Sequence, residues 1–326
     1  MPNHFSNRQQ LRKPAVSSKG GIVAAQSRAA AEIGAEVLAN GGDCIDAVVA
    51  TGFALGVLEP WMSGPGGGGA MVLYRAKENR VEVIDYGMRT PDSLRLEDYP
   101  LTGDGATAAD IFPWARVKDD RNLQGPGSIA VPGMVAGMGE AHRRHARLPW
   151  HDLVAPSVKL AGEGLLVDWW TTAMISSSAA DLRRYPASAA AFLKDGLPPN
   201  PQWGIKSVVR LPQEQLKATL SHLGAAGARD FYQGDLARSI ARDIQAAGGA
   251  LSVEDLAAFQ AHVREPLKIP YRGGTVFATP ELTAGPTLAH TLRLLQSSLQ
   301  AGAASKPDAA AYLAYVEALQ AAYLER

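Results

Sequence analysis

Four consecutive glycines, Gly66 to Gly69, follow the lead-in Glu59-Pro60-Trp61-Met62-Ser63-Gly64-Pro65 and precede a strand-like segment. Glycine this dense weakens regular structure, and a chain tolerates it where the backbone needs positive φ or where another group approaches the main chain closely. We expect a tight connection between a buried helix and a buried strand, and Ser63 with the glycines is a candidate for shaping a substrate pocket. A nucleotide-binding loop is excluded, because the run lacks the Gly-x-x-x-x-Gly-Lys-Ser/Thr pattern and leads into a strand.

The histidines and the cysteine are residue types that bind metals, but their surroundings favour structural roles. His142 and His145 stand three residues apart in an expected helix, among arginines and with no carboxylate beside them. We expect this pair on a solvated face. Cys44 is the only cysteine, which excludes an intrachain disulfide and a multi-cysteine metal site. It lies in an apolar helical pattern and is expected to be a small buried residue. We predict no metal site and no cofactor.

Adjacent hydroxyls at Thr171 and Thr172 offer nucleophiles by type, but they follow two tryptophans inside a helical pattern. We expect them to be ordinary helix residues. Asp46 and Glu59 are acidic residues flanked by apolar ones. A buried charge needs a partner, so we expect structural partners for both rather than a general acid–base role.

Regular elements must position these residues, and the hydrophobic spacing predicts many helices and few strands. Ser27 and Asp43 are expected to cap two helices, the first through Leu38 and the second through about Leu58. The second is apolar on most sides and should be deeply buried. Strands are expected over 70–75 and 81–85, joined by a polar turn. After a surface excursion over 91–127, helices are expected over 133–146, 151–161, 168–183, 213–223, 235–247, 253–261, 287–300 and 308–326, and strands that return to the sheet over 263–269 and 275–278.

Composition bounds the kind of protein this is. The chain has 326 residues, enough for a sizeable core, and 46% of them are hydrophobic. Charges balance at 32 basic against 32 acidic residues, which argues against nucleic acid or a membrane surface as a partner. No apolar run approaches the ~18 residues of a membrane span. The polar N-terminal residues predict a cytoplasmic protein, or a periplasmic one if a leader was removed.

The glycine run and its lead-in resemble the signature of the gamma-glutamyltransferase (gamma-glutamyl transpeptidase) family of N-terminal-nucleophile hydrolases. The resemblance continues in order along the chain. It includes Gly21–Ala25, which looks like the family's opening strand, and the segments Ala39–Ala47, Val131–Gly137, Phe231–Gly234, Gly248–Leu251, Glu254–Leu256 and Tyr271–Gly273. It implies an α+β fold, the αββα four-layer sandwich, completed by a small subunit that is not in this chain. We expect residues 1–20 to be a flexible tail and residues 21–326 to be the large-subunit region, with its C-terminal segment before the cleavage site absent or unresolved.

The resemblance also implies a mechanism. The precursor cuts itself, and the new N-terminal threonine attacks an acyl carbonyl, with its own amine as the base. The family motif that supplies this threonine, Thr-Thr-His-x-Ser, has no match here, because Thr171 and Thr172 lack the histidine and come too early. We therefore expect no catalytic residue in this chain. The nucleophile is expected on a small subunit derived from the same precursor.

The resemblance further implies an arginine after the second strand, within Asp-x-Arg-Glu-x-Ala-Pro, that binds the substrate α-carboxylate. Here the segment reads Asp85-Tyr86-Gly87-Met88-Arg89-Thr90-Pro91, so Gly87 holds the arginine's place and Arg89 stands two positions later. Residues two apart in an extended segment point to the same side. Arg89 is therefore the candidate substrate-binding residue, and a surface or structural ion-pair role is an equal alternative.

The predicted function is that of the large subunit of an autoprocessed amidohydrolase or acyltransferase. It would cleave a gamma-glutamyl or related acyl amide, such as glutathione, and pass the acyl group to water or an amine. Gly87 suggests an alternative, a cephalosporin acylase or another acylase of the superfamily. A second alternative is a non-catalytic homologue that binds a small ligand.

Overall fold

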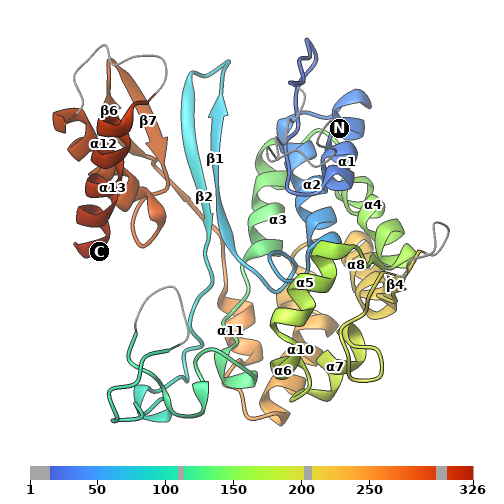
Figure 1. The fold of residues 1–326 in the computed structure, drawn as a ribbon. Helices are drawn as coiled ribbons and strands as arrows, with labels where there is room; N and C mark the ends of the chain where they lie inside the picture. The colour runs from blue at the N-terminus through green and yellow to red at the C-terminus, as the bar shows by residue number, and fades with distance from the viewer. Residues whose placement is uncertain (1–14, 109–113, 202–207, 299–306, 326) are drawn as a thin grey trace, which may run out of the picture.

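The computed structural model describes residues 15–108, 114–201, 208–298 and 307–325. The fold is α+β, as predicted. A helical body stands on one side of a long β-hairpin, and a C-terminal arm stands on the other side (Figure 1). The predicted tail over 1–20 lies mostly outside the described residues, as do the last residues of both helices expected at 287–300 and 308–326.

The hairpin predicted around residues 70–85 is confirmed. Strand β1 (Gly69–Arg75) pairs along its whole length with β2 (Arg80–Tyr86), and β2 also pairs with β5 (His262–Arg264), all antiparallel. Within the described residues β1 is therefore an edge strand. The register sets Asp85 opposite His262 and Val83 opposite Arg264, which joins two segments far apart in the sequence.

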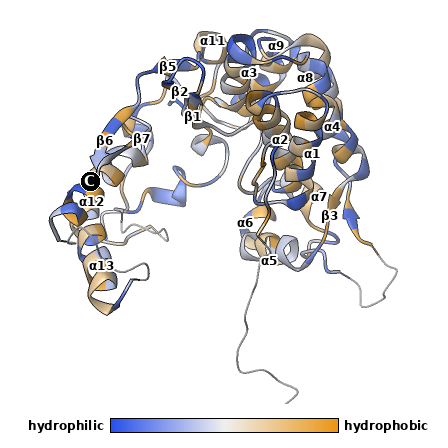
Figure 2. Ribbon diagram, turned by 90° about the horizontal axis from the view of Figure 1, so that it is seen from above, coloured by the Kyte–Doolittle hydropathy of each residue, from blue (hydrophilic) through white to orange (hydrophobic). Residues whose placement is uncertain are grey.

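The core of the helical body forms around α2 (Cys44–Leu58), the helix predicted to be deeply buried. Ten of its 15 residues are buried, and its ribbon is largely hydrophobic in Figure 2. Helices α1 (Arg28–Ala39), α3 (Met134–His145) and α4 (Trp150–Glu163) pack against α2, and α8 (Glu214–Ala226) packs against α4. Burial of this apolar surface is the main stabilising contribution to the body.

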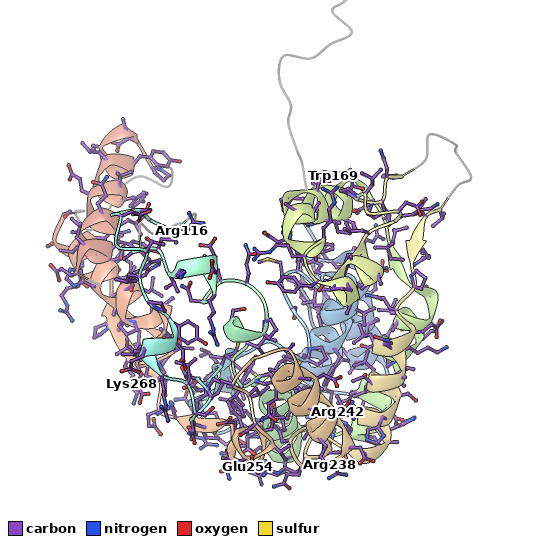
Figure 3. The ribbon with its side chains drawn as sticks, turned by 90° about the horizontal axis from the view of Figure 1, so that it is seen from below. Arg116, Trp169, Arg238, Arg242, Glu254 and Lys268 are labelled. Atoms are coloured by element: carbon purple, nitrogen blue, oxygen red, sulfur yellow. The ribbon has the colours of Figure 1, made fainter. Side chains whose placement is uncertain are left out.

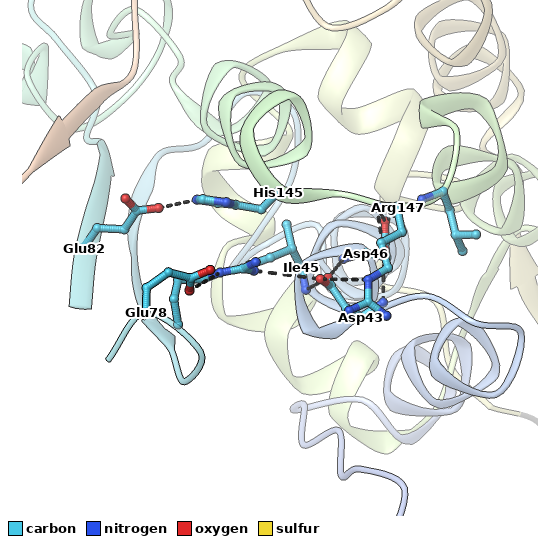
Figure 4. A network of polar contacts seen from close by, with 9 residues as sticks. Asp43, Ile45, Asp46, Glu78, Glu82, His145 and Arg147 are labelled. Carbon is cyan, nitrogen blue, oxygen red and sulfur yellow. Dashed lines mark hydrogen bonds and ion pairs between the residues drawn. The ribbon is translucent and has the colours of Figure 1, made fainter. Parts of the chain in front are cut away.

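Asp46 connects the start of α2 to the turn after α3, which is the structural role expected of it. The Asp43 side chain accepts hydrogen bonds from Ile45 N and Asp46 N, and Asp46 Oδ2 accepts one from Asp43 N, which forms a capping box. Asp46 Oδ1 also accepts the backbone N–H groups of Arg147 and Leu148, each at 3.1 Å (Figure 4). A fully buried carboxylate thereby holds the start of α2 against the turn after α3.

The other helices and strands surround this core or build the arm. The helices of the body are α5 (Trp169–Ser177), α6 (Ala179–Leu182), α7 (Pro186–Phe192), α9 (Asp230–Gln233), α10 (Asp235–Ala246) and α11 (Val253–Ala258). Two short strands, β3 (Leu165–Leu166) and β4 (Arg210–Leu211), pair with each other. The C-terminal arm consists of the hairpin β6 (Leu267–Tyr271) and β7 (Gly274–Ala278) with α12 (Ala284–Ser298) and α13 (Ala309–Leu324).

Three element predictions are wrong. Residues 21–25 form no strand, because no described strand pairs with their backbone, and Ile22 is exposed. The helix expected over 168–183 is two helices, since Ser178 leaves helical geometry. The strand expected over 263–269 is interrupted at Glu265–Pro266, and its halves β5 and β6 belong to different sheets. Proline has no N–H for a ladder, which explains the break. The excursion over 91–127 is largely irregular where it is described, as predicted.

Two side-chain predictions also need correction. Cys44 is exposed rather than buried, because it is the first residue of α2 and precedes the buried turns. His142 and His145 do not lie on a solvated face. His142 Nε2 lies 2.9 Å from Leu148 O, and the nearly buried His145 contacts Glu82 on β2 (Figure 4). The carboxylate partner missing from the local sequence comes from the hairpin.

The described residues contain no helix long and apolar enough to cross a membrane.

Candidate active-site cleft

A cleft of about 750 Å³ opens where β2 ends, between the hairpin, the end of α11 and the start of the arm. It brings together the predicted site segment and residues far away in the sequence, including Gly87, Arg89, Phe259, His262, Arg264 and Glu281. The antiparallel pairing of β2 with β5 produces this convergence, because it sets the end of one strand beside the start of the other. Charged groups of both signs therefore line the cleft.

Arg264 is the best-fixed cation of the cleft. Its Nε donates to Asp85 Oδ2 at 2.9 Å, and its Nη1 donates to Glu281 Oε1 at 2.7 Å. Charge-assisted hydrogen bonds of this length are among the stronger ones in proteins. The guanidinium therefore ties β2 to the loop that leads into α12, and two carboxylates balance its charge.

Arg89, the predicted substrate-binding residue, also lines the cleft. Its backbone is held by paired hydrogen bonds with Val131, at 3.2 and 2.7 Å. Its side chain is 55% exposed, and Nη2 donates to Asp92 Oδ1 at 2.6 Å. Arg89 therefore lines the cleft and forms an ion pair, and its role in substrate binding stays a prediction. An exposed pair of this kind is worth little and exchanges easily.

Asp255 fixes the segment that follows Arg89. It is buried and accepts hydrogen bonds from Asp92 N at 2.8 Å and from Ser252 N and Oγ at 2.9 and 2.7 Å. Burial alone would raise the pKa of Asp255, but these hydrogen bonds and the charge of Arg89 outweigh it and lower the pKa below its usual range. Asp255 therefore stays ionised and orients the Asp92 backbone.

Gly87 leaves room at the place where the family arginine is expected. Its N–H donates to Asp85 Oδ1 at 3.0 Å. A Cβ added here would meet only that oxygen, at 3.4 Å, with no other heavy atom within 4 Å. The backbone can therefore carry a side chain at this position, and the glycine is not required by packing.

The backbone of the glycine-rich run packs closely against the end of β2. Gly67 O accepts the N–H groups of Gly133 and Met134, at 2.8 and 2.9 Å, so the run meets the Pro132-Gly133 turn. A Cβ on Gly133 would lie 2.0 Å from Tyr86 O, and one on Gly68 would lie 2.9 Å from the same atom. Side chains here would push β2 away. The predicted packing role of the run is confirmed, and Ser63 does not line the cleft.

The tyrosine and phenylalanine behind the turn complete this support. Tyr232 Oη donates to Pro132 O at 2.9 Å and accepts from Ala136 N at 3.0 Å. Its ring stacks on Phe259, with centroids 5.7 Å apart, and Phe259 lines the cleft. Burial raises the pKa of Tyr232, so its hydroxyl stays protonated and available as a donor.

The remaining predicted residues lie elsewhere in structural roles. Thr171 Oγ1 donates to Leu166 O at 3.0 Å, and Thr172 Oγ1 donates to Asp168 O at 3.0 Å and to Pro199 O at 2.9 Å, which confirms them as helix residues. Sequence reasoning missed Arg264 and Glu281. The signal for Arg264 was its position at the end of an expected strand, but no local sequence feature indicates its pairing with Asp85, 179 residues away.

Comparison with known proteins decides the family. A sequence profile described as gamma-glutamyltranspeptidase matches residues 30–326. This chain belongs to the gamma-glutamyltranspeptidase family. The resemblance that its glycine run and its ordered segments indicated is thereby confirmed.

Relatives within and around this family carry two kinds of name. The chain is 33% identical over 317 residues to the Acylase ACY 1 proenzyme of Pseudomonas sp. (strain V22), which covers 97% of the chain and 54% of that relative. It is also 33% identical over 267 residues to the Glutathione hydrolase proenzyme of Bacillus subtilis (strain 168), which covers 82% of the chain and 43% of that relative. The chain thus spans about half the length of the curated relatives it matches.

A solved member of the gamma-glutamyltranspeptidase family shares the fold. The crystal structure of Helicobacter pylori gamma-glutamyltranspeptidase superposes with a TM-score of 0.84 at 27% identity, over 96% of this chain and 85% of that one. The predicted N-terminal-nucleophile hydrolase fold is therefore confirmed. The described residues contain a three-stranded sheet and two two-stranded sheets, so the stacked central layers of the sandwich are not completed by them alone.

Proposed function

We propose that this chain is the large subunit of an autoprocessed N-terminal-threonine enzyme that cleaves an acyl amide. The observation that carries the proposal is the cleft at the end of β2, which lies on the family's expected substrate segment and holds Arg89 and Arg264. Thr171 and Thr172 of α5 donate their hydroxyl hydrogens to main-chain carbonyls, so neither is available as a nucleophile. A companion polypeptide, released from the same precursor, supplies the attacking threonine.

In this proposal the companion threonine attacks the acyl carbonyl, and its own amine accepts the hydroxyl proton. An α-amine suits this role because its ordinary pKa is about 7.7–8.0. The amine of the leaving group departs with a proton, and an acyl-enzyme ester remains. Water or a second amine then attacks the ester and regenerates the threonine. The large subunit binds and orients the acyl group in the cleft.

We propose Arg89 as the group that binds the α-carboxylate of a gamma-glutamyl substrate. Its guanidinium lines the cleft, and its partner Asp92 is an exposed carboxylate that a substrate carboxylate can replace. Arg264 is a poorer candidate, because its guanidinium already forms ion pairs with Asp85 and Glu281. The glutathione hydrolase name of the Bacillus relative is consistent with this substrate class.

Three para-nitroanilides that differ by one group each test this assignment. The gamma-glutamyl compound carries both an α-amine and an α-carboxylate, the gamma-aminobutyryl compound lacks the carboxylate, and the glutaryl compound lacks the amine. Arg89→Gln should raise KM for the gamma-glutamyl compound about tenfold, because it removes a charge-assisted hydrogen bond to the carboxylate. KM for the gamma-aminobutyryl compound should not change. Arg95→Gln, an exposed arginine of the same segment, is the matched control. Equal effects of Arg89→Gln on both compounds would remove Arg89 from this role.

An acylase that takes other acyl groups is a second candidate function, favoured by Gly87. With glycine at the position of the family arginine, the cleft has space in place of a fixed cation. The name of the Pseudomonas relative is consistent with this substrate class. The wild-type enzyme would then hydrolyse the glutaryl or gamma-aminobutyryl compound at least as well as the gamma-glutamyl one. If no amide is cleaved by the fully processed protein, the binding-only alternative replaces both.

The cellular location stays a prediction. Fractionation of cells that express the whole gene distinguishes the cytoplasm from the periplasm.

A further inference from the structure

A second pocket, of about 490 Å³, lies where the end of α2 meets the starts of α1 and α5. We call it the tryptophan pocket, defined by Arg28, Glu59, Trp61, Asp168, Trp169 and Trp170. It shares no lining residue with the Arg89 cleft. Trp169 is labelled in Figure 3 at the start of α5.

Glu59 is the unusual group in this pocket. The residue is only 9% exposed, yet its carboxylate has no hydrogen-bond or ion-pair partner in the described chain. The structural partner predicted for its side chain is therefore missing among the described residues, while its backbone N–H donates to Leu55 O and its carbonyl accepts from Met62 N and Ser63 N. Its carboxylate oxygens are not fully enclosed, so they open onto the pocket that Glu59 lines, where a ligand can reach them.

Two carboxylates and the C-terminal end of α2 supply negative potential there, opposite the positive N-terminal ends of α1 and α5. Glu59 caps the C-terminal end of α2, where the helix dipole is negative and where the last turn holds no basic residue. Asp168, the N-cap of α5, adds a second carboxylate. Burial first, and then the charge of Asp168, raise the pKa of Glu59. Among the described lining residues the one cation is Arg28, whose side chain is 91% exposed and pairs with Glu32, Nε to Oε1 at 2.8 Å, rather than with Glu59.

The aromatic residues add the second requirement of a cation site. Trp169 and Trp170 lie edge to face, with centroids 5.6 Å apart, and both are exposed to solvent. Trp61 lines the same pocket. Indole faces attract organic cations through their quadrupole, most strongly for quaternary ammonium groups. A stripe of tryptophans without nearby carboxylates would only indicate an apolar ligand.

We propose that the tryptophan pocket binds a small organic ammonium cation, with Glu59 and Asp168 balancing its charge and the indoles contacting its methyl or methylene groups. Binding supplies the missing partner of Glu59 and favours its ionised form. A small inorganic cation would leave the aromatic surface unused.

Choline and its uncharged carbon analogue, dimethylbutanol, are matched probes with nearly the same shape. Titration of the purified full-length protein, followed by tryptophan fluorescence and calorimetry, should give saturable choline binding at least about tenfold tighter than dimethylbutanol. Acidification should weaken choline binding, because protonated Glu59 carries no charge, and leave dimethylbutanol unaffected. Equal affinity for both probes at neutral pH would overturn the proposal.

Substitutions locate the site. Glu59→Gln should weaken choline binding about tenfold, whereas Glu97→Gln, an exposed carboxylate in the excursion, should not change it. Because Glu59 is buried, Trp169→Leu serves as a second variant whose exposed position does not endanger folding, and it should also weaken choline binding. Undiminished binding in both variants would place choline elsewhere and refute the assignment.

Discussion

Glu82 shows how one carboxylate can connect the sheet to the helical body. It projects from β2, is 3% exposed, and contacts His145, Arg144 and Arg80. Burial alone would raise its pKa, but the hydrogen bond to His145 and the charges of His145, Arg144 and Arg80 outweigh burial and lower it. The ionised form therefore belongs to the folded state.

This coupling predicts a pH-dependent contribution to stability. A carboxylate whose pKa is depressed on folding stabilises the protein above its ordinary pKa, here 4.5, and that contribution is lost as the pH falls through the folded value. Glu82→Gln should lower the free energy of unfolding by about 1–3 kcal/mol at neutral pH, and the difference from wild type should shrink below pH 4.5. Urea denaturation across this range measures it.

Glu78→Gln is the control for this prediction, since Glu78 lies on the neighbouring turn with its side chain 52% exposed. It should change stability little at any pH. A constant difference between Glu82→Gln and wild type from neutral to acidic pH would contradict the coupling of Glu82 ionisation to folding.

Residue roles that depend on contacts across the fold could not be predicted from the sequence. His145 was expected on a solvated face because its local neighbours are arginines, but a strand 63 residues away supplies its carboxylate. Cys44 was expected to be buried because its helix is apolar, but it stands before the first buried turn. The family resemblance pointed to the segment of Arg89, which lines the cleft, whereas Arg264 and Glu281 needed the antiparallel register.

Among the elements, α2 was the easiest to predict. Its contact with the turn after α3 was the hardest to predict from the sequence. Its capping residue and its apolar length are local features, so its bounds agree with the structure. The second function of Asp46, which accepts two N–H groups from the turn after α3, depends on a contact 101 residues away. Helices such as α7, and the short strands β3 and β4, were missed because their few residues carry too little periodicity.

The anchoring of α2 can be tested with Asp46→Asn. The amide keeps one acceptor oxygen and places an NH₂ group among N–H donors, so at least one buried donor loses its partner. We expect the free energy of unfolding to fall by about 1–3 kcal/mol. The exposed Glu36→Gln on α1 should have almost no effect in the same urea experiment. An unchanged stability of Asp46→Asn would mean that solvent satisfies these donors.

At the scale of the molecule, apolar surface and a free strand edge are left uncovered. The arm exposes Leu313, Val316 and Leu319 on α13, and within the described residues β1 has no partner on its outer edge. The arm and the helical body stand on opposite sides of the hairpin (Figure 1). An edge strand and an apolar helix face are surfaces that another polypeptide can cover. These features agree with the companion subunit in the proposed function.

Expression of the whole gene tests this arrangement. The mass spectrum of the purified protein should show two polypeptides, the second beginning with threonine. Amide hydrogen exchange of β1 and α13 should be slower in that sample than in this chain expressed alone, because a neighbour now protects them. One intact polypeptide, together with unchanged exchange, would argue for a subunit that works without a companion.

The open space at Gly87 has a consequence for how this protein changes over generations. Glycine codons of the form GGN become arginine codons of the form CGN through one base change. A Cβ at this position meets Asp85 Oδ1 at ordinary contact distance, so the backbone accepts a side chain there. Under the proposed function, the change between a glycine and an arginine in the substrate segment is a single mutational step, and Gly87→Arg recreates that step in the laboratory.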